Sequence, residues 1–458
     1  MENFNENIID ISYYETRISK ALFYITEYGK NSIPKIIQNK FIKATENDEI
    51  LFSKDERNNF IKACHYGYYL GQYLVLKELL KLNDLRIIIK EKIKTANIQN
   101  QKKHKNNLSF TLKKIDFIEA LYRNVIDTLF WIIFKYEGAY IRRLNINGES
   151  NLRINLRKSN IKSAINYIKS FRKKDLLSFV LITDLTSFVQ IGDLIIIDFN
   201  KGIRIIELKA GEVNKKIYNF LDSFYITQCP HAIKTFREAE GDKVFEQLNR
   251  VIKQERKLKE LTQIINKNEG VDIHSGHRIK IEDKTNVPLE TYTNTVINLL
   301  KATNDKNYAL DVVDNCLLIG VYKDKMELAF EMWKKSLSIH YPTISLVSSV
   351  YSIGISPIFL LPFPRKDVFD IITNRKKILL CLNYDMWFKL CSEKGVYLNW
   401  LSKKESAKEK IKNYKPFEMN NRLIKFKTSE TEGLLSDLFA SRIFYELITP
   451  LSVVELYK

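Results

Sequence analysis

Two runs of apolar, largely β-branched residues on either side of a short polar turn constrain the fold more than any other feature of this sequence. The runs occupy residues 191–199 and 203–208, and the tripeptide Asn-Lys-Gly at 200–202 separates them. This spacing predicts a β-hairpin with a three-residue loop and glycine at the left-handed position. We therefore expect an antiparallel strand pair here.

The predicted hairpin brings two acidic residues and one lysine to the same face. Closing the loop pairs Phe199 with Ile203, and this register places Asp193 opposite Lys209. Glu207 lies two residues before Lys209, and side chains two apart in a strand share a face. Asp193, Glu207 and Lys209 should therefore project from one side of the sheet.

Two carboxylates that converge in this way repel one another unless a cation lies between them. Such oxygen ligands suit Mg²⁺, which binds one or two carboxylates together with water and phosphate oxygens. The metal polarises a phosphoryl group and lowers the pKa of bound water, while a nearby lysine orients or deprotonates that water. The three side chains form a minimal set for phosphodiester hydrolysis.

The order of these residues resembles the core of the PD-(D/E)xK nuclease superfamily, which includes many restriction endonucleases. The resemblance covers residues 192–211 of 458: Gly192 and Asp193, a strand, a turn, then the tripeptide Glu-Leu-Lys at 207–209. Gly192 stands where the family name has proline. The resemblance implies that Asp193 and Glu207 bind Mg²⁺, with Mn²⁺ able to substitute, and that the main-chain carbonyl of Leu208 assists. It makes Lys209 the catalytic lysine that acts on the attacking water.

Members of the superfamily often carry a further catalytic acid on a helix before the core. Glu119 is the first candidate here and Glu137 the second. The apolar helix predicted from Asp116 onward offers an alternative, because Asp116 and Glu119 have the spacing of a helix N-cap and its capping-box acid. Both interpretations of Glu119 stay open at this point.

A strongly basic segment precedes the hairpin. Residues 141–174 contain ten Lys or Arg and one acid, a net +9 out of the +19 of the whole chain. Clustered cations displace counterions together and so favour nucleic acid. A solvated helix face and an anionic membrane surface are the alternatives. The candidate nucleic-acid contacts are Arg153, Arg157, Lys158, Lys162, Arg172, Lys173 and Lys174.

A second basic element follows the hairpin. Residues 245–267 have helical periodicity, and Gln247, Arg250 and Gln254 recur on it at spacings of three and four. This is similar to the helix of the superfamily that carries a glutamine and contacts the nucleic-acid backbone near the cut. A solvated helix face explains the same spacing.

The chain is expected to be α/β, with three parts. An N-terminal helical domain spans 1–105, a restriction-endonuclease-like core with a central mixed sheet flanked by helices spans 106–290, and a C-terminal α/β region of unknown role spans 291–458. The polar stretch at 90–107 is the best linker candidate. The uncharged segment 341–364 contains prolines and serines, so we expect buried strands and turns there and no contact with a membrane.

The sequence favours a Mg²⁺-dependent endonuclease that acts on DNA. Five scattered cysteines form no CxxC pair, and the first residues are polar and acidic, so a cytoplasmic protein is expected. No GxxxxGK[ST] or GxGxxG motif supports a nucleotide-driven motor or a dinucleotide enzyme. A role in bacterial anti-phage defence, as a homodimer or with a partner protein, is a hypothesis. The alternative is a non-catalytic nucleic-acid-binding or scaffold protein with the same fold.

Overall fold

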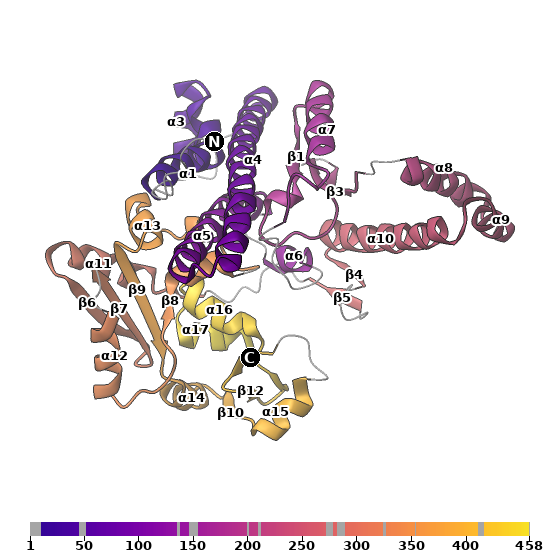
Figure 1. The fold of residues 1–458 in the computed structure, drawn as a ribbon. Coiled ribbons are helices and arrows are strands. Elements are labelled where there is room, and N and C mark those ends of the chain that lie inside the picture. Colours follow the sequence, from indigo (N-terminus) through magenta and orange to yellow (C-terminus); the bar gives the residue numbers. More distant parts are fainter. Residues whose placement is uncertain are drawn as a thin grey trace. The chain divides into compact units, whose positions relative to one another are not determined.

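A computed structural model describes residues 11–44, 52–134, 138–145, 154–198, 201–208, 212–271, 278–281, 289–323, 327–352, 354–410 and 416–457. The chain divides into two compact units, Met1–Asp283 and Lys284–Lys458, here called unit 1 and unit 2. Both combine helices with small sheets, and every strand pair in the described ranges is antiparallel (Figure 1). The protein is therefore mixed α/β.

A long helical hairpin forms the frame of unit 1. Helix α4 (Lys54–Ile98) begins with a capping box made by Ser53 and Glu56, and α5 (Lys102–Ile133) runs back along it after a short turn. The linker predicted at 90–107 is wrong, because these residues extend the two helices instead of separating domains. The expected boundary at 105–106 lies inside α5, within unit 1.

Glycines on α4 allow another helix to approach closely. A Cβ atom on Gly67 would lie 2.4 Å from the carbonyl oxygen of Tyr24, and one on Gly71 would lie 2.8 Å from Ile25. Both neighbours belong to α1 (Ile11–Thr26), which packs on α4. The remaining short helices of this part are α2 (Tyr28–Asn31), α3 (Lys35–Ala44) and α6 (Gly138–Arg143).

A three-stranded sheet of order β1-β2-β3 lies beside α4, with strands β1 (Ser178–Ile182), β2 (Leu194–Asp198) and β3 (Gly202–Ile206). Gln72 on α4 accepts from the N–H of Ile182 at 2.9 Å and donates to the carbonyl of Val180 at 3.1 Å. The amide thus satisfies backbone groups of β1 as a neighbouring strand would. The sheet was expected to be mixed, but its described strands are all antiparallel.

The predicted hairpin is present, but in another register. Ile197 pairs with Ile203 and Asp198 with Gly202, so β2 ends at Asp198 and β3 begins at Gly202. The expected pairing of Phe199 with Ile203 is wrong by two residues, because Gly202 (φ +83°) is already the first residue of β3. A shift of two residues keeps every side chain on its predicted face.

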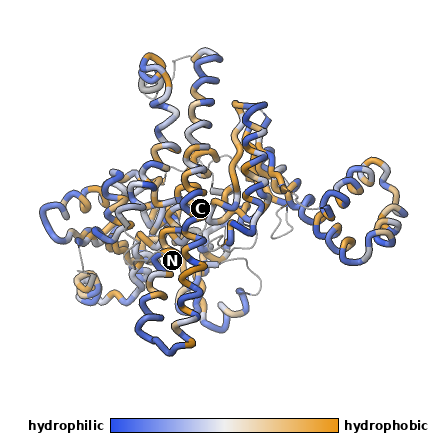
Figure 2. Tube along the Cα trace, turned by 45° about the horizontal axis from the view of Figure 1, so that its top comes forward, coloured by the Kyte–Doolittle hydropathy of each residue, from blue (hydrophilic) through white to orange (hydrophobic). Residues whose placement is uncertain are grey.

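Three helices beyond the sheet form a small arm. They are α8 (Glu212–Thr227), α9 (Pro230–Glu240) and α10 (Asp242–Lys267), which includes the helix predicted at 245–267. Ile217 and Leu221 on α8 pack with Leu248 and Val251 on α10. Figure 2 shows blue hydrophilic residues interspersed with orange ones around α8 and α9, at the right of the view, as expected for amphipathic helices. The other elements of unit 1 are α7 (Ile161–Lys174), β4 (Glu269–Val271) and β5 (Arg278–Lys280).

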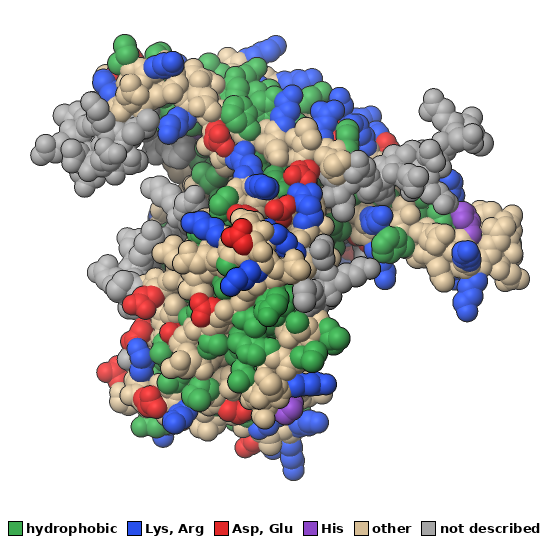
Figure 3. Space-filling view, turned by 90° about the vertical axis from the view of Figure 1, so that its left-hand side faces the viewer, with side chains coloured by type: hydrophobic (Ala, Val, Ile, Leu, Met, Phe, Trp, Pro, Cys, Tyr) green, Lys and Arg blue, Asp and Glu red, His purple; other side chains and the backbone are tan. Residues whose placement is uncertain are grey.

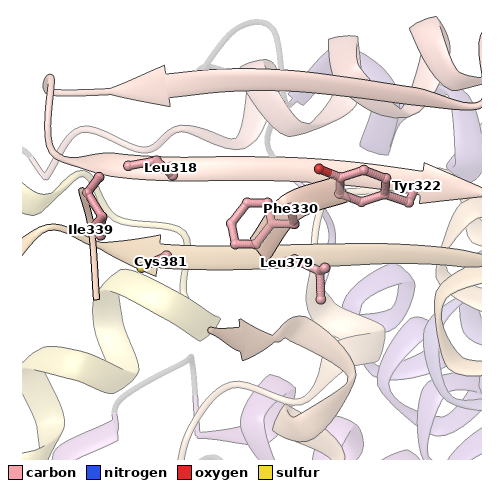
Figure 4. Packing of buried hydrophobic residues seen from close by; sticks show 6 residues of the cluster. All are labelled: Leu318, Tyr322, Phe330, Ile339, Leu379 and Cys381. Carbon is pink, nitrogen blue, oxygen red and sulfur yellow. The ribbon is translucent and has the colours of Figure 1, made fainter. Parts of the chain in front are cut away.

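Unit 2 is built on a four-stranded antiparallel sheet of order β6-β7-β9-β8, with strands β6 (Tyr308–Val313), β7 (Leu317–Lys323), β9 (Lys376–Leu382) and β8 (Ile344–Ser345). Figure 4 shows the buried cluster on this sheet, in which Phe330 of α12 (Glu327–Ser336) packs edge-on against Tyr322 of β7 and Leu318 of β7 belongs to the same cluster. The α/β character expected for 291–458 is therefore confirmed.

The rest of unit 2 follows in short elements. A second small sheet contains β10 (Tyr397–Trp400), β11 (Glu418–Met419), β12 (Arg422–Lys427) and β13 (Glu432–Leu434). The helices are α11 (Thr293–Asp305), α13 (Arg365–Ile372), α14 (Tyr384–Glu393), α15 (Lys403–Lys410), α16 (Asp437–Tyr445) and α17 (Pro450–Val454). In 341–364, β8 is followed by the 3₁₀ turns Leu346–Tyr351 and Ile358–Leu360. No helix among the described residues is long and apolar enough to cross a membrane.

Unit 2 exposes several large apolar side chains. Leu328 and Met332 on α12 are 71% and 64% exposed, and Tyr308 and Val312 of the edge strand β6 are also exposed. Figure 3, which faces the left-hand side of Figure 1, shows hydrophobic side chains gathered on the lower part of the view. Patches of this kind are common at contact surfaces.

Candidate active site

The hairpin carries two acids to one cavity. Asp193 directly precedes β2 and Glu207 directly follows β3, and Leu194 and Ile206 between them are paired across the strands. Asp193 and Glu207 both line a cavity of about 490 Å³. The other polar or charged residues that line it are Asp184, Gln190, Gln254 and Lys257. A pocket of this size with a few convergent polar groups is the usual form of a small-ligand or catalytic site.

The residue before Asp193 must be glycine for steric reasons. Gly192 has φ +69°, and a Cβ atom there would lie 2.5 Å from Ile205 of β3. Its carbonyl accepts from the hydroxyl of Thr183 at 2.6 Å. The backbone therefore turns sharply at Gly192 and is held in that turn while Asp193 enters the sheet, a conformation that only glycine adopts without strain.

A hydrogen-bond network joins the two halves of the predicted motif. The main-chain N–H of Leu208 donates to Oδ2 of Asp193 at 2.5 Å. The amide of Asn160 donates to the carbonyl oxygen of Leu208 at 2.9 Å and lies 3.3 Å from each carboxylate oxygen of Asp193. Asn160 is a site residue that the sequence did not suggest, because nothing local distinguishes it from an ordinary residue before a helix.

The donor set is compatible with a hard divalent cation. Asp193, Glu207 and the carbonyl of Leu208 offer only oxygen, the ligand type that Mg²⁺ prefers. A carboxylate has about four lone-pair sites and a carbonyl two, so the hydrogen bonds described above leave acceptor capacity. Within the described residues, no group of three or more His, Cys, Asp or Glu could hold a metal ion. Lys209 lies outside the described residues.

Glu119 lies away from the cavity lining, in a buried ionic cluster between α4 and α5. Its carboxylate accepts from Arg86 of α4 and, at 2.9 Å, from Arg123. Burial on its own raises the pKa of Glu119, but the two guanidinium groups outweigh burial and lower it. The alternative role as a capping box is wrong, because α5 begins at Lys102 and so Asp116 lies within the helix. Glu137 lies outside the described residues.

The ionic cluster reaches the cavity through the backbone. Arg123 is fully buried and donates to the carbonyl oxygens of Asp184, at 2.6 Å, and Thr186, at 2.9 Å. Asp184 belongs to a 3₁₀ turn, Thr183–Leu185, that follows β1, and it is one of the residues that line the cavity. Glu119 is thus connected to the wall of the cavity through Arg123. Asp184 was not identified from the sequence. The one signal that could have suggested it is its position directly after an apolar strand.

The basic segment before the sheet presents all five of its lysines to solvent. Lys158, Lys162, Lys173 and Lys174 are exposed, as is Lys169. On α7, residues 162, 169 and 173 share one face, since they lie seven and four residues apart. Arg153 lies outside the described residues.

Two of the candidate arginines are engaged elsewhere. Arg157 makes a two-pronged ion pair with Asp84 of α4, with distances of 2.7 and 2.6 Å. The hydrogen bond raises the pKa of Arg157 and lowers that of Asp84. Arg172 stacks over the rings of Tyr66 and Tyr69 at 5.3 and 4.3 Å. Both arginines therefore hold α7 and the segment before it against α4.

Helix α10 supplies the opposite wall of the cavity. Of the three residues predicted on it, Gln254 lines the cavity, Arg250 is exposed, and Gln247 donates to Asn214 of α8 at 3.2 Å. Lys257 also lines the cavity, one turn after Gln254. These positions share one helix face with Arg250.

The far end of α10 is tied to the sheet. Asn266 accepts from the N–H of Ile203 and donates to its carbonyl, both at 2.9 Å. On the arm side, Glu207 also borders a second cavity of about 350 Å³ with Lys215, Tyr218 and Asn219 of α8. Glu207 therefore lies between two hollows, each with a lysine in its wall.

Comparison of the chain with models of known protein families gives no match, and comparisons with curated proteins and with solved structures give no significant match. What the chain does is therefore inferred from the geometry and chemistry of its own site.

Proposed function

We propose that the chain is a Mg²⁺-dependent nuclease that hydrolyses phosphodiester bonds of nucleic acid, with DNA as the favoured substrate and Mn²⁺ as a substitute metal. The observation that carries the proposal is that Asp193 and Glu207, from two strands of one hairpin, line the same cavity together with Gln254 and Lys257. Acidic oxygen ligands beside a cation and an amide donor suit a phosphate group held next to a metal.

Each residue has a proposed role. Asp193, Glu207 and the carbonyl of Leu208 would hold Mg²⁺, which polarises the phosphoryl group and supplies a water of lowered pKa. Lys209, two residues after Glu207, orients or deprotonates the attacking water. Lys257 and Gln254 bind the phosphate backbone from the wall of α10.

The exposed lysine face of α7 extends this interaction beyond the cavity. Lys162, Lys169 and Lys173 are solvent-exposed, so they can neutralise phosphates without losing an existing ion pair, as Arg157 would. Phosphate contacts of this type position a strand and provide affinity without reading its sequence.

On this proposal, the sheet β1-β2-β3 with its flanking helices is a restriction-endonuclease-like core. The enzyme would act in the cytoplasm, as an effector of bacterial anti-phage defence, with the parts of the chain outside the core sensing or docking a trigger. A homodimer or a complex with a partner protein of the same defence system would then present the site to both strands of a duplex.

The proposal is tested by incubating the wild type, Asp193→Ala and Lys209→Ala with plasmid, linear duplex, single-stranded DNA and structured RNA. Parallel reactions contain Mg²⁺, Mn²⁺ or EDTA. Lys201→Ala is the matched control, because Lys201 lies in the loop of the same hairpin with its side chain 77% exposed. Metal-dependent cleavage by the wild type and Lys201→Ala, absent from the other two variants, supports the nuclease and identifies its substrate.

A second candidate is a nucleic-acid-binding protein or scaffold that does not cleave. It is favoured by the finding that Glu119, the first candidate for a further catalytic acid, is held in a buried ion cluster by Arg86 and Arg123. It predicts binding without cleavage, unchanged in Asp193→Ala and Lys209→Ala. Repeating the assay with proteins encoded beside this chain distinguishes a pure binder from a nuclease that awaits an activator.

A further inference from the structure

Asn160 occupies the N-cap position of a helix, where the side chain of asparagine normally caps the first turn. It is the residue immediately before α7, and an asparagine there usually accepts a hydrogen bond from a main-chain N–H of the first helical turn. The side chain of Asn160 makes no such bond. Asn160 thus lacks the N-cap hydrogen bond that its position favours. Departures from local preference of this kind are common at functional sites.

The side chain points instead at the hairpin. Its amide nitrogen contacts three acceptors, the carbonyl oxygen of Leu208 at 2.9 Å and both carboxylate oxygens of Asp193 at 3.3 Å. All three can only accept, so the NH₂ group and not the oxygen of Asn160 must face them. One amide therefore bridges two groups that come from different strands.

The bridge closes a ring of contacts around Leu208. The N–H of Leu208 donates to Asp193, and its carbonyl accepts from Asn160, which also contacts Asp193. The backbone between Glu207 and Lys209 is thus held at its donor and at its acceptor. If either bond were absent, the carbonyl of Leu208 could rotate away from the carboxylate of Asp193.

We propose that Asn160 is a positioning residue that sets the carbonyl of Leu208 and the carboxylate of Asp193 in the arrangement that a divalent cation requires. This inference rests on the proposed metal site and adds to it a residue outside the motif. The carbonyl and the carboxylate each keep acceptor sites that the amide does not use. Loss of a hydrogen-bonding partner of a metal ligand typically changes metal affinity roughly 10–100-fold.

The test measures metal binding directly. Calorimetric titration of the full-length apo-protein with Mn²⁺ compares the wild type with Asn160→Ala, Asn160→Ser, Asp193→Ala and Asn166→Ala. Asn166 is the control, since it is an exposed asparagine on the same helix α7. Thermal unfolding without metal is recorded for each variant.

Asn160→Ser separates the proposed role from a structural one. Serine is a good residue before a helix, but its hydroxyl is too short to reach Leu208 and Asp193 together. We expect this variant to unfold at the wild-type temperature or above and to bind Mn²⁺ roughly 10–100-fold more weakly. Asn160→Ala should bind equally weakly, and Asn166→Ala should bind like the wild type.

The outcomes for Asn160 and for the metal site are distinguishable. Wild-type affinity in both Asn160 variants, with binding lost in Asp193→Ala, overturns the role of Asn160 and leaves the metal site standing. Tighter binding in Asn160→Ala also overturns it, because the amide would then compete with the cation. No Mn²⁺ binding by the wild type, or unchanged binding in Asp193→Ala, overturns the metal site and the role of Asn160 together.

Discussion

The main-chain N–H of Leu208 donates a hydrogen bond to Oδ2 of Asp193, across the open end of the β2–β3 hairpin. The two residues are 15 positions apart in the chain, and each belongs to a different half of the predicted motif. The carboxylate of Asp193 thereby orients the peptide that connects Glu207 to Lys209. Asp193 therefore contributes a hydrogen bond to the backbone of the candidate site as well as a negative charge.

Replacing Asp193 with asparagine should separate these two contributions. Asparagine keeps an oxygen that can accept from Leu208, so the free energy of unfolding should stay near the wild-type value. The charge that holds the metal is lost, and cleavage should fall on the order of 10²–10³-fold. Asp193→Ala should lose the same activity and also about 1–3 kcal/mol of stability. Urea unfolding and cleavage rates measure both effects, and equal stability of the two variants would contradict the role of the hydrogen bond.

Glu119→Gln should lower the free energy of unfolding strongly and change the cleavage rate of the folded protein little. The carboxylate is buried between Arg86 and Arg123, and removing one partner of a buried ion cluster costs about 3–5 kcal/mol. Glu212→Gln is the control, because its pair with Lys215 is largely exposed and is worth at most about 1 kcal/mol. Both are measured by urea unfolding. Lost cleavage at wild-type stability would instead assign Glu119 to the chemistry.

Asp127 should make the protein less stable as the pH rises toward neutral. It is buried on α5, and burial raises its pKa to about 7 although hydrogen bonds from Ser187 oppose the shift. Between the unfolded pKa of 3.8 and about 7, the folded state holds a proton that the unfolded state has lost. The free energy of unfolding therefore falls with rising pH, by up to about 4 kcal/mol, and stays constant above pH 7.

Asp127→Asn removes this titration. The free energy of unfolding of the variant, relative to that of the wild type, should therefore increase as the pH rises from about 4 to about 7. Asparagine can still accept from the N–H of Ser187. Urea unfolding of both proteins at pH 5 and pH 8 measures the difference, with Asp222→Asn, an exposed position on α8, as the control. Parallel stability curves for wild type and Asp127→Asn would show that Asp127 is not protonated in the folded protein.

Two adjacent cations on α10 should differ in their effect on cleavage. Lys257 lines the cavity, whereas Arg256 pairs with Glu260 at 2.9 Å and is not among the lining residues. Lys257→Ala should lower kcat/KM about 10–100-fold, the value of one charge-assisted hydrogen bond. Arg256→Ala removes the same charge and should change kcat/KM less than about threefold. Similar losses in both variants would mean that α10 contributes only long-range charge.

The lysine face of α7 should contribute to the affinity for DNA by displacing counterions from the phosphates, so its contribution should depend on the salt concentration. Changing Lys162, Lys169 and Lys173 together to Gln should lower the slope of log Kd against log salt by up to about 3 for duplex DNA. Arg157→Gln should change the slope less, because Asp84 already neutralises that cation. Fluorescence anisotropy across a salt series measures both. An unchanged slope in the triple variant would move the nucleic-acid contact away from α7.

The hairpin shows which structural features local sequence patterns can predict and which they cannot. The alternation of side chains and the turn residues at 200–202 predicted two antiparallel strands and placed Asp193 and Glu207 on one face, which the register of β2 and β3 confirms. The pairing itself was wrong by two residues. Gly202 packs closely against a residue far away in the chain, since a Cβ atom on Gly202 would lie 2.6 Å from the amide oxygen of Asn266. That contact spans 64 residues and leaves no trace in the local pattern.

The sequence by itself determined the two antiparallel strands of the hairpin, the helix at 245–267, the basic segment and the acids of the hairpin, because periodicity, turn residues and charge are properties of neighbouring residues. Only the tertiary structure decided which partners these residues meet. It buried Glu119 between two arginines, brought Asn160 to Leu208 from 48 positions away, and set Lys257 in the wall of the cavity. These outcomes depend on the packing of separate elements, where burial and hydrogen bonding between distant residues outweigh local preference.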